Sequence, residues 1–343
     1  MTAASPFSRR LDLTGTVELF HGGGGRAMAQ LNAELFRKHL RDVQDGDAAL
    51  LPPVSGRLAV TTDASVVAPR WFPGGDMGSL AINGTVNDLA MRGARPLALT
   101  VSMVLEEGLP LQELERLAQS LAASAAAVPV PVVAGDTKVV ERGKGDGVFL
   151  SVAGVGVVPD GVTLEASAIR PGDRVLVSGT LGDHGMTLMS LREGLGFAGD
   201  LQSDCQPLVD LVASLLAVSG VRCLRDPTRG GLAATVNELA WAGACGFLLD
   251  ETAIPIRPTV QAAGELLGID PLTVANEGKL VAIVAPDAAD RLLTVARAHP
   301  KGRDAALIGT VTDDPRHFVQ LKTELGGTRI LDWLMGEQLP RIC

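Results

Sequence analysis

Hydrophobic positions in the N-terminal half switch between helical and strand spacing. Met28, Leu31 and Leu35 are three and four residues apart, which predicts a helix that begins directly after four glycines. Apolar residues at helical spacing predict two further helices, at 75–91 and 111–127. Apolar runs predict strands at 58–62, 97–105, 128–134 and 148–157. The third of these strands is expected to lead into a loop, Gly135-Asp136-Thr137-Lys138.

The C-terminal half repeats this mixture after a break. Two strong turn signals, Pro159-Asp160-Gly161 and Pro171-Gly172-Asp173, enclose a polar stretch, and the domain boundary is expected there. Beyond it, the pattern predicts strands at 174–177, 280–284 and 306–311 and helices at 207–218, 231–242 and around 330–335. Both halves therefore belong to the α/β (α+β) class.

Composition and charge restrict the partners of the chain. Its 343 residues exceed the roughly 250 residues at which single cores stop growing, and 46% hydrophobic residues can form a sizeable core. Lys and Arg number 30 against 39 Asp and Glu, which gives a net charge of −9. Aromatic residues make up only 3%. Because nucleic acids and anionic membranes both attract basic patches, neither is expected as a partner.

The cysteines favour a reducing compartment. Cys205, Cys223, Cys245 and Cys343 are too far apart for a Cys-x-x-Cys pair and too few for a disulfide framework. The first three are expected to be buried filler. No apolar segment follows the basic N-terminus, and no uninterrupted apolar run reaches about 18 residues. A cytoplasmic protein is therefore expected.

The glycine run is a candidate phosphate site. Gly22, Gly23, Gly24 and Gly25 precede the first predicted helix, where bare backbone N–H groups and the helix dipole favour an anion. A flexible surface loop explains the run equally well. No Gly-x-x-x-x-Gly-Lys-Ser/Thr motif is present, so a P-loop is excluded. The spacing of Gly22, Gly24 and Ala27 also matches a dinucleotide fingerprint loosely.

Several aspartates stand where apolar segments end. Asp63, Asp88 and Asp136 close or flank such segments, and we expect them to converge at one edge of the first sheet, where their repulsion requires a cation. Asp47 and Asp226 lie in similar motifs. Each aspartate alone is more often a turn former or helix cap. As a group, their hard oxygen atoms suit Mg²⁺ that carries nucleotide phosphates.

Three further residues are candidates for the reaction itself. Glu277 precedes a predicted strand and has the chemistry of an acid or base, while Lys138 beside Asp136 has that of a positioning cation. A turn and a solvated lysine are the alternatives. Cys343 is the last residue and by itself would be an inert thiol. Arg341 is expected to lower the pKa of this thiol modestly.

Seven motifs, in order over nearly the whole chain, resemble the HypE family of hydrogenase maturation factors. The terminal Pro-Arg-Ile-Cys distinguishes this family from its superfamily. The other motifs resemble the wider superfamily of aminoimidazole ribonucleotide synthetase, selenophosphate synthetase and thiamine-phosphate kinase. The sequence departs from the family at 45–49, where Asp-Gly-Asp-Ala-Ala replaces Gly-Asp-Asp-Ala-Ala and leaves open whether Asp45 is a ligand. The motifs are Thr61-Thr62-Asp63, Phe72-Pro73-Gly74-Gly75-Asp76, Asn83-Gly84-Thr85-Val86-Asn87-Asp88-Leu89-Ala90-Met91, Gly135-Asp136-Thr137-Lys138-Val139-Val140, Asp226-Pro227-Thr228-Arg229-Gly230-Gly231-Leu232, Asn276-Glu277-Gly278 and Pro340-Arg341-Ile342-Cys343.

The resemblance implies a two-domain fold like that of aminoimidazole ribonucleotide synthetase. An N-terminal mixed sheet would form the core of a homodimer, with a C-terminal α/β domain beside it and ATP and Mg²⁺ near the interface. The implied segments are an arm (1–40), an ATP-binding and dimerisation domain (41–165), a C-terminal domain (166–332) and a mobile tail (333–343). The implied nucleotide contacts are Gly22, Gly23, Gly24, Gly25, Thr62, Asp63, Asn87, Asp88, Gly135, Asp136 and Asn276. The implied metal ligands are Asp47, Asp63, Asp88, Asp136 and Asp226.

The resemblance also implies the reaction. The carbamoyltransferase HypF would load a carbamoyl group onto Cys343, and the chain would use ATP to dehydrate it to an S-cyanate. Cyanide would pass to iron on the HypC–HypD complex for a [NiFe]-hydrogenase. Glu277 is the expected base, and Lys138 is expected to hold the thiocarboxamide. The tail is expected to have an inward and an outward state, since nine residues span roughly 30 Å when extended.

Three other functions stay open at this stage. An ATP-dependent ligase or kinase of the same superfamily would act on a free small molecule and would not need Cys343. A non-catalytic adaptor would sense nucleotide and present its tail without turning ATP over. The loose glycine fingerprint leaves a dinucleotide-dependent oxidoreductase as a more distant alternative.

Overall fold

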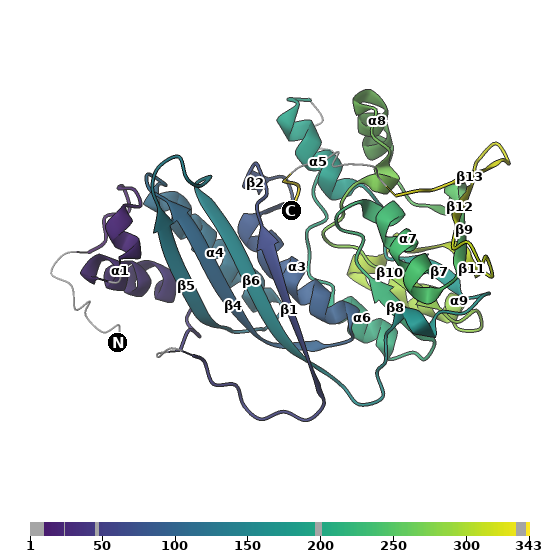
Figure 1. Ribbon diagram of the computed structural model, residues 1–343, viewed down its shortest axis with the longest axis horizontal. Helices are drawn as coiled ribbons and strands as arrows, with labels where there is room; N and C mark the ends of the chain where they lie inside the picture. The colour runs from purple at the N-terminus through teal and green to yellow at the C-terminus, as the bar shows by residue number, and fades with distance from the viewer. Residues whose placement is uncertain (1–9, 24, 45–47, 196–200, 334–340) are drawn as a thin grey trace.

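The structure, a computed structural model, describes residues 10–23, 25–44, 48–195, 201–333 and 341–343. The chain forms two halves, each a sheet with helices packed on it, and the described chain end lies between them (Figure 1). This arrangement confirms the predicted mixed α/β class.

The N-terminal half contains a four-stranded sheet with the order β1-β6-β4-β5. Strands β4 and β5 are parallel and are joined by α4, whereas β6 pairs antiparallel with β1 and β4. Helices α3 and α4 lie against one face of the sheet (Figure 1). The elements are β1 (Arg57–Ser65), β2 (Trp71–Phe72), β3 (Gly75–Asp76), α3 (Met77–Met91), β4 (Arg95–Glu106), α4 (Leu111–Ala127), β5 (Val132–Val140) and β6 (Val148–Val158).

Helix α3 is the central element of this half. It begins at a capping box in which Asp76 accepts the Ser79 N–H at 2.9 Å and the Ser79 hydroxyl accepts the Asp76 N–H at 2.9 Å. The helix is buried nearly all round, and Ile82 and Val86 are inaccessible to solvent. Its polar residues therefore point into the protein, where they are available to a site.

The opposite face of the sheet is open. Along β1, Thr61 and Asp63 face α3, whereas Leu58, Val60 and Thr62 face outward. Leu58 and Val60 are 62% and 72% exposed. Because side chains alternate along a strand, the adjacent residues Thr62 and Asp63 lie on opposite faces of the sheet.

The segment before the sheet packs beside the edge strand β5. Leu31 and Leu35 are fully buried, as their spacing predicts. The elements are the 3₁₀ turn η1 (Leu19–Gly22), α1 (Arg26–Leu31), the π-helical turn η2 (Asn32–Phe36) and α2 (Arg37–His39).

The C-terminal half is a seven-stranded sheet between helices, with the order β13-β12-β9-β11-β7-β10-β8. Val175 and Val177 of β7 pack in the same cluster as residues of α7, whereas Leu176 packs with residues of α6 and α9. The strands are β7 (Arg174–Val177), β8 (Val221–Arg225), β9 (Gly246–Asp250), β10 (Val281–Val284), β11 (Ala306–Thr312), β12 (Val319–Lys322) and β13 (Thr328–Ile330). The α-helices are α5 (Asp183–Arg192), α6 (Val209–Leu216), α7 (Gly231–Gly243), α8 (Pro258–Leu267) and α9 (Ala289–Ala298), and the 3₁₀ turns are η3 (Ala166–Ala168), η4 (Glu251–Ala253), η5 (Pro271–Thr273) and η6 (Pro300–Gly302).

The described elements confirm the predicted helices and strands with two exceptions. The expected loop at 135–138 is wrong, because these residues lie inside β5, whose parallel pairing with β4 continues to Val140. The expected helix around 330–335 is wrong over 330–333, because Ile330 ends β13 and the next three residues are irregular. In both segments strand pairing prevails over a local pattern that did not show it.

Among the helices of the described segments, none combines the length and the apolar composition needed to cross a bilayer.

Candidate active site at the docked chain end

The last three residues are docked beside the segment that follows β1. The Val66 N–H donates to the Cys343 carbonyl at 3.0 Å, and the Ala68 N–H donates to the Arg341 carbonyl at 3.2 Å. Between them, Ile342 is 3% exposed in the core of the N-terminal half. These contacts hold Cys343 in one position between the two halves of the chain.

Two arginines hold the chain end in place. Arg192 donates to the carbonyl oxygens of Ala68, at 2.7 Å, and of Arg341, at 2.6 Å. The Arg341 side chain donates to the Val66 carbonyl at 3.0 Å and forms an ion pair with Asp146. Arg341 therefore anchors the main chain.

The thiol of Cys343 has a raised pKa. Burial and the negative charge of Glu277 raise the pKa of Cys343 to about 11, although Arg229, whose guanidinium donates to Sγ at 3.7 Å, opposes the shift. The expectation that Arg341 lowers this pKa is wrong, because Arg341 points to Asp146. At neutral pH the docked sulfur is therefore a thiol.

Glu277 is a buried carboxyl group beside the thiol. It is 5% exposed, and its Oε1 has no hydrogen-bond partner among the described residues. Burial raises the pKa of Glu277 well above its usual range, and the charges of Asp204, Asp63, Asp226 and Asp88 raise it further. A buried acceptor without a partner is uncommon and indicates a group that meets a ligand.

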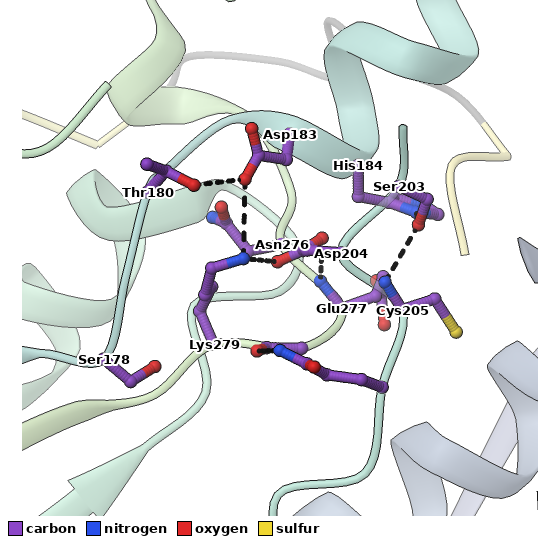
Figure 2. Close-up of polar contacts among 12 residues, drawn as sticks. Ser178, Thr180, Asp183, His184, Ser203, Asp204, Cys205, Asn276, Glu277 and Lys279 are labelled. Carbon is purple, nitrogen blue, oxygen red and sulfur yellow. Dashed lines mark hydrogen bonds and ion pairs between the residues drawn. The ribbon is translucent and has the colours of Figure 1, made fainter. Parts of the chain in front are cut away.

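A network of charged side chains contacts the main chain of Glu277, as Figure 2 shows. Lys279 Nζ lies 3.0 Å from Asp204 Oδ2 and 3.4 Å from Asp183 Oδ2, with all three side chains buried. Asp204 Oδ1 accepts the Glu277 N–H at 3.1 Å. Burial, the largest single cause, would raise the pKa of Asp204, but Lys279, His184 and the Glu277 N–H together outweigh it, so the net shift is downward. Asp204 thus holds an ionised carboxylate at the backbone of Glu277.

A second group of carboxylates, Asp63, Asp88 and Asp226, also lies close enough to raise the pKa of Glu277. The Thr61 hydroxyl donates to Asp88 at 2.8 Å, and burial, followed by the charge of Asp63, raises the pKa of Asp88. Burial and the charge of Asp88 raise the pKa of Asp226 to about 7. Asp63, Asp88 and Asp226 are therefore close enough for their charges to repel one another. The repulsion predicted from the sequence is that among Asp63, Asp88 and Asp136.

Asp226→Asn is expected to stabilise the protein at pH 8 by up to about 4 kcal/mol, since a pKa of about 7 against 3.8 corresponds to roughly three units. When a carboxyl group has a higher pKa in the folded state than in the unfolded state, the folded protein loses stability as the pH rises between the two values. Thermal unfolding at pH 5 is the internal control, because most wild-type Asp226 is then protonated and the difference should shrink. If the difference in stability between Asp226→Asn and the wild type were the same at pH 5 and pH 8, the raised pKa of Asp226 would be contradicted.

Asn87 and Asn276 are committed to the protein itself. Asn87 on α3 accepts the Leu208 N–H at 2.7 Å and donates to the Gln206 carbonyl at 3.0 Å, which ties the two halves together. Asn276 accepts the Gly182 N–H at 2.8 Å and donates to the Pro227 carbonyl at 3.0 Å. Both asparagines position the loops around Glu277, and their contact with a nucleotide stays a prediction.

Asp136, Lys138 and Gly22 lie at the opposite edge of the N-terminal sheet. Asp136 is on β5, three strands from Asp63 on β1, a lateral separation of about 14 Å. Lys138 reaches Asp136 at 2.7 Å, and Gly22 packs against Val139 of the same strand. The expected convergence of Asp136 with Asp63 and Asp88 at one edge is therefore wrong within one chain. Thr62, Gly23, Gly25 and Gly135 are exposed, and Gly24, Asp45 and Asp47 lie outside the described residues.

The described carboxylates do not form a complete metal site in one chain. Over the described ranges, no three His, Cys, Asp or Glu side chains are grouped so that they could hold a metal ion. The repulsion among Asp63, Asp88 and Asp226 nevertheless fits a cation that takes further ligands from a bound phosphate.

Sequence reasoning missed three residues of the site. His184 contacts Ile342, 158 positions away, and Asp204 lies in a polar stretch without periodicity. Arg229 belongs to a motif that the sequence analysis quoted, but its role beside the sulfur depends on the docked chain end. No local signal marks the first two.

Comparisons with known proteins identify the family of the chain. Residues 45–158 match the family described as AIR synthase related protein, N-terminal domain, and residues 170–322 match its C-terminal domain. A carbamoyl dehydratase HypE of Azotobacter vinelandii is 58% identical over 339 residues, which cover 97% of this chain and 99% of the relative.

Two solved structures are also similar. A crystal structure of the hydrogenase maturation protein HypE in complex with ATP has a TM-score of 0.90 at 44% identity and covers 95% of this chain and 99% of its own. A HypE–HypF complex has a TM-score of 0.79 at 40% identity and covers 90% and 100%. The chain belongs to the AIR synthase related family and, within it, to the HypE carbamoyl dehydratases of hydrogenase maturation.

Proposed function

We propose that this chain uses ATP to dehydrate a carbamoyl group on its own Cys343 to a thiocyanate, which supplies a cyanide ligand for the iron of a [NiFe]-hydrogenase. One observation carries the proposal: the docked Cys343 lies close enough to Glu277 for the charge of that carboxylate to raise the pKa of the thiol, and the buried Glu277 Oε1 has no partner among the described residues. The names of the relatives, carbamoyl dehydratase and hydrogenase maturation protein, support the same reaction.

The chemistry has two demands. The oxygen of an S-carboxamide is a poor leaving group, so it attacks the γ-phosphorus of ATP and ADP leaves, while one N–H proton is lost and a C=N bond forms. Loss of the second N–H proton then expels phosphate and leaves S–C≡N. ATP thereby takes up the water as ADP and phosphate, and no oxidant is required.

The residues around Cys343 fit these demands. We assign Glu277 as the base that accepts the first N–H proton, since its raised pKa makes the ionised carboxylate a strong base, and the departing phosphate takes the second. Arg229 at the sulfur holds the adduct in place. Lys138 is on the outer face of β5, so its proposed contact with the thiocarboxamide requires a second copy of the chain.

ATP and Mg²⁺ are proposed as the reactants that accompany the adduct. The HypE structure solved with ATP supports the nucleotide. Asp63, Asp88 and Asp226 would hold Mg²⁺, because their burial and repulsion are relieved by a cation. The bound cation would screen the charge of the phosphates.

A homodimer would bring the two separated groups of site residues together, Cys343 and Glu277 of one subunit and Asp136 and Lys138 of the other. The open face of the N-terminal sheet exposes Leu58 and Val60, and a second copy that covers this face would also cover Asp136 and Lys138. We propose this pairing for the segment 41–165, with 166–332 as the flanking domain. The family matches to 45–158 and 170–322 support the division.

Val60→Asp is expected to convert the dimer to a monomer, because burying one carboxylate per subunit in an apolar interface costs several kcal/mol. Light scattering after size-exclusion chromatography measures the mass. Leu325→Asp is the matched control, since Leu325 is 97% exposed in the C-terminal half and its change should leave the mass unaltered. A Val60→Asp protein with the mass of the dimer would contradict this interface.

The partners follow from the position of the thiol. Cys343 is partly buried and fixed by backbone hydrogen bonds, so it must leave the site to receive a carbamoyl group. The HypE–HypF complex supports a HypF carbamoyltransferase as the donor. We propose HypC–HypD as the cyanide acceptor, an outward tail state for both encounters, and the cytoplasm as their place.

Mass spectrometry of the C-terminal peptide tests the proposed function. The chain is carbamoylated with HypF and then incubated with MgATP. Loss of one water at Cys343, absent without ATP, is expected. An unchanged adduct despite ATP binding would favour a nucleotide-sensing adaptor, and phosphorylation of an added small molecule without Cys343 would favour a kinase or ligase.

A further inference from the structure

Two adjacent residues, Ser203 and Asp204, reach the two reacting groups of the site by separate routes. Ser203 contacts His184, which holds the thiol-bearing chain end, and Asp204 contacts the backbone of Glu277 (Figure 2). We infer that Ser203 and Asp204 are a positioning pair that aligns the Cys343 adduct with Glu277. The inference rests on the proposed function.

The first route runs through His184, which is fully buried. Its Nε2–H donates to the Ile342 carbonyl at 2.7 Å, so its Nδ1 accepts from the Ser203 hydroxyl at 2.8 Å. Burial lowers the pKa of His184, which keeps the ring neutral and preserves this arrangement. The Ile342 carbonyl therefore sets the tautomer of His184, and the Ser203 hydroxyl holds the ring in place from its other side.

The second route runs through Asp204, whose side chain is 2% exposed. One carboxylate oxygen accepts the Glu277 N–H at 3.1 Å and the other lies 3.0 Å from Lys279 Nζ. The carboxylate needs both oxygens as acceptors, which asparagine of the same size does not provide. Lys279 is held in turn by Asp183, so the position of the Glu277 main chain is set by a buried ionic network.

The segment that carries both residues is held between two glycines of the quoted motifs. Gly74 has φ +87°, and a Cβ there would lie 2.4 Å from the Ser203 carbonyl oxygen. A Cβ on Gly278 would lie 1.8 Å from the Asp204 carbonyl oxygen. Such close backbone contacts leave the segment little freedom, so Ser203 and Asp204 keep fixed positions relative to His184 and Glu277.

The test combines Ser203→Ala, Asp204→Asn and the double variant in the full-length chain. The rate constant and the KM for MgATP are measured on the HypF-carbamoylated protein. Alkylation of Cys343 by iodoacetamide is measured on the unmodified protein without nucleotide. Ser214→Ala and Asp210→Asn are the matched controls, because they make the same substitutions on the side of α6 that faces away from its core contacts, where Ser214 donates to the Asp210 carbonyl and Asp210 forms an ion pair with Lys301.

Ser203→Ala is expected to speed Cys343 alkylation by roughly fivefold, the equivalent of one hydrogen bond. Asp204→Asn should leave alkylation within about twofold and lower kcat by about 10–100-fold, with an unchanged KM for MgATP. If Ser203 and Asp204 act as one unit, the fold-decrease in kcat of the double variant is much smaller than the product of the fold-decreases of the two single variants. The controls should match the wild type.

Three results would overturn the inference. They are an unchanged rate of Cys343 alkylation in Ser203→Ala, an Asp204→Asn effect on the KM for MgATP in place of kcat, and a decrease in kcat of the double variant equal to the product of the single decreases. A variant that unfolds at a lower temperature but keeps kcat would assign these residues a purely structural role. The proposed function is judged separately. If the wild type releases no water with ATP, the function fails, and the alkylation rates still decide whether Ser203 holds the chain end.

Discussion

Glu277→Gln is expected to lower the rate of ATP-dependent dehydration at Cys343 by about 10²–10⁴-fold, the usual contribution of a positioned base. Glutamine retains the volume and the hydrogen-bond acceptor at this buried position but cannot take a proton at neutral pH. The wild-type rate should rise with pH, since burial raises the pKa of Glu277 and the base must be ionised. The variant should lack this dependence. Single-turnover dehydration of the carbamoyl adduct measures both effects.

The controls for this result separate chemistry from binding. Glu265→Gln on exposed α8 changes a carboxylate outside the site and should keep the wild-type rate. ATP binding by Glu277→Gln should persist within a few-fold, because Glu277 is assigned to the adduct. A variant that dehydrates at more than about a tenth of the wild-type rate would remove Glu277 as the base.

Gly278→Ala is expected to lower dehydration by at least about 100-fold and to destabilise the chain by about 1–3 kcal/mol, the range found for overpacked sites. The added Cβ would meet the Asp204 carbonyl oxygen at 1.8 Å and Gln206 Cγ at 2.6 Å, so the segment beside Glu277 must move. Activity and thermal unfolding are measured together on the same preparations.

Gly327→Ala is the matched glycine change. Its Cβ would find Thr323 Oγ1 at 3.4 Å, an ordinary contact far along the chain from the site. Its activity should equal that of the wild type. If Gly278→Ala were as active as Gly327→Ala, the alignment of Glu277 would not depend on the Asp204 segment.

Local patterns predicted an element correctly where its own apolar spacing was strong, but they left others unpredicted, among them β8, β9, α5, α8 and α9. The stripe of Leu111, Leu114, Leu117 and Leu121 predicts α4, and all four residues are buried in it. The same patterns contain no information on strand order. They therefore placed Asp136 beside Asp63, although β6 and β4 separate the strands that carry them.

The candidate site was predictable only where a motif names a residue. Cys343 and Glu277 were identified from motifs of a known family, and the structure brings them together. His184 and Asp204 act through contacts with residues more than 70 positions away, so their roles depend on the tertiary fold. Arg341 was misassigned because sequence proximity to Cys343 does not fix the direction of its side chain.

The fate of the carbamoyl oxygen tests the central claim most directly. Cys343 is carbamoylated with an oxygen-18 carbonyl, MgATP is added, and the released phosphate and the C-terminal peptide are weighed by mass spectrometry. ATP-driven dehydration predicts one labelled oxygen in phosphate for each thiocyanate formed. Label that appears in water, or that stays on the protein while ATP is consumed, would contradict it.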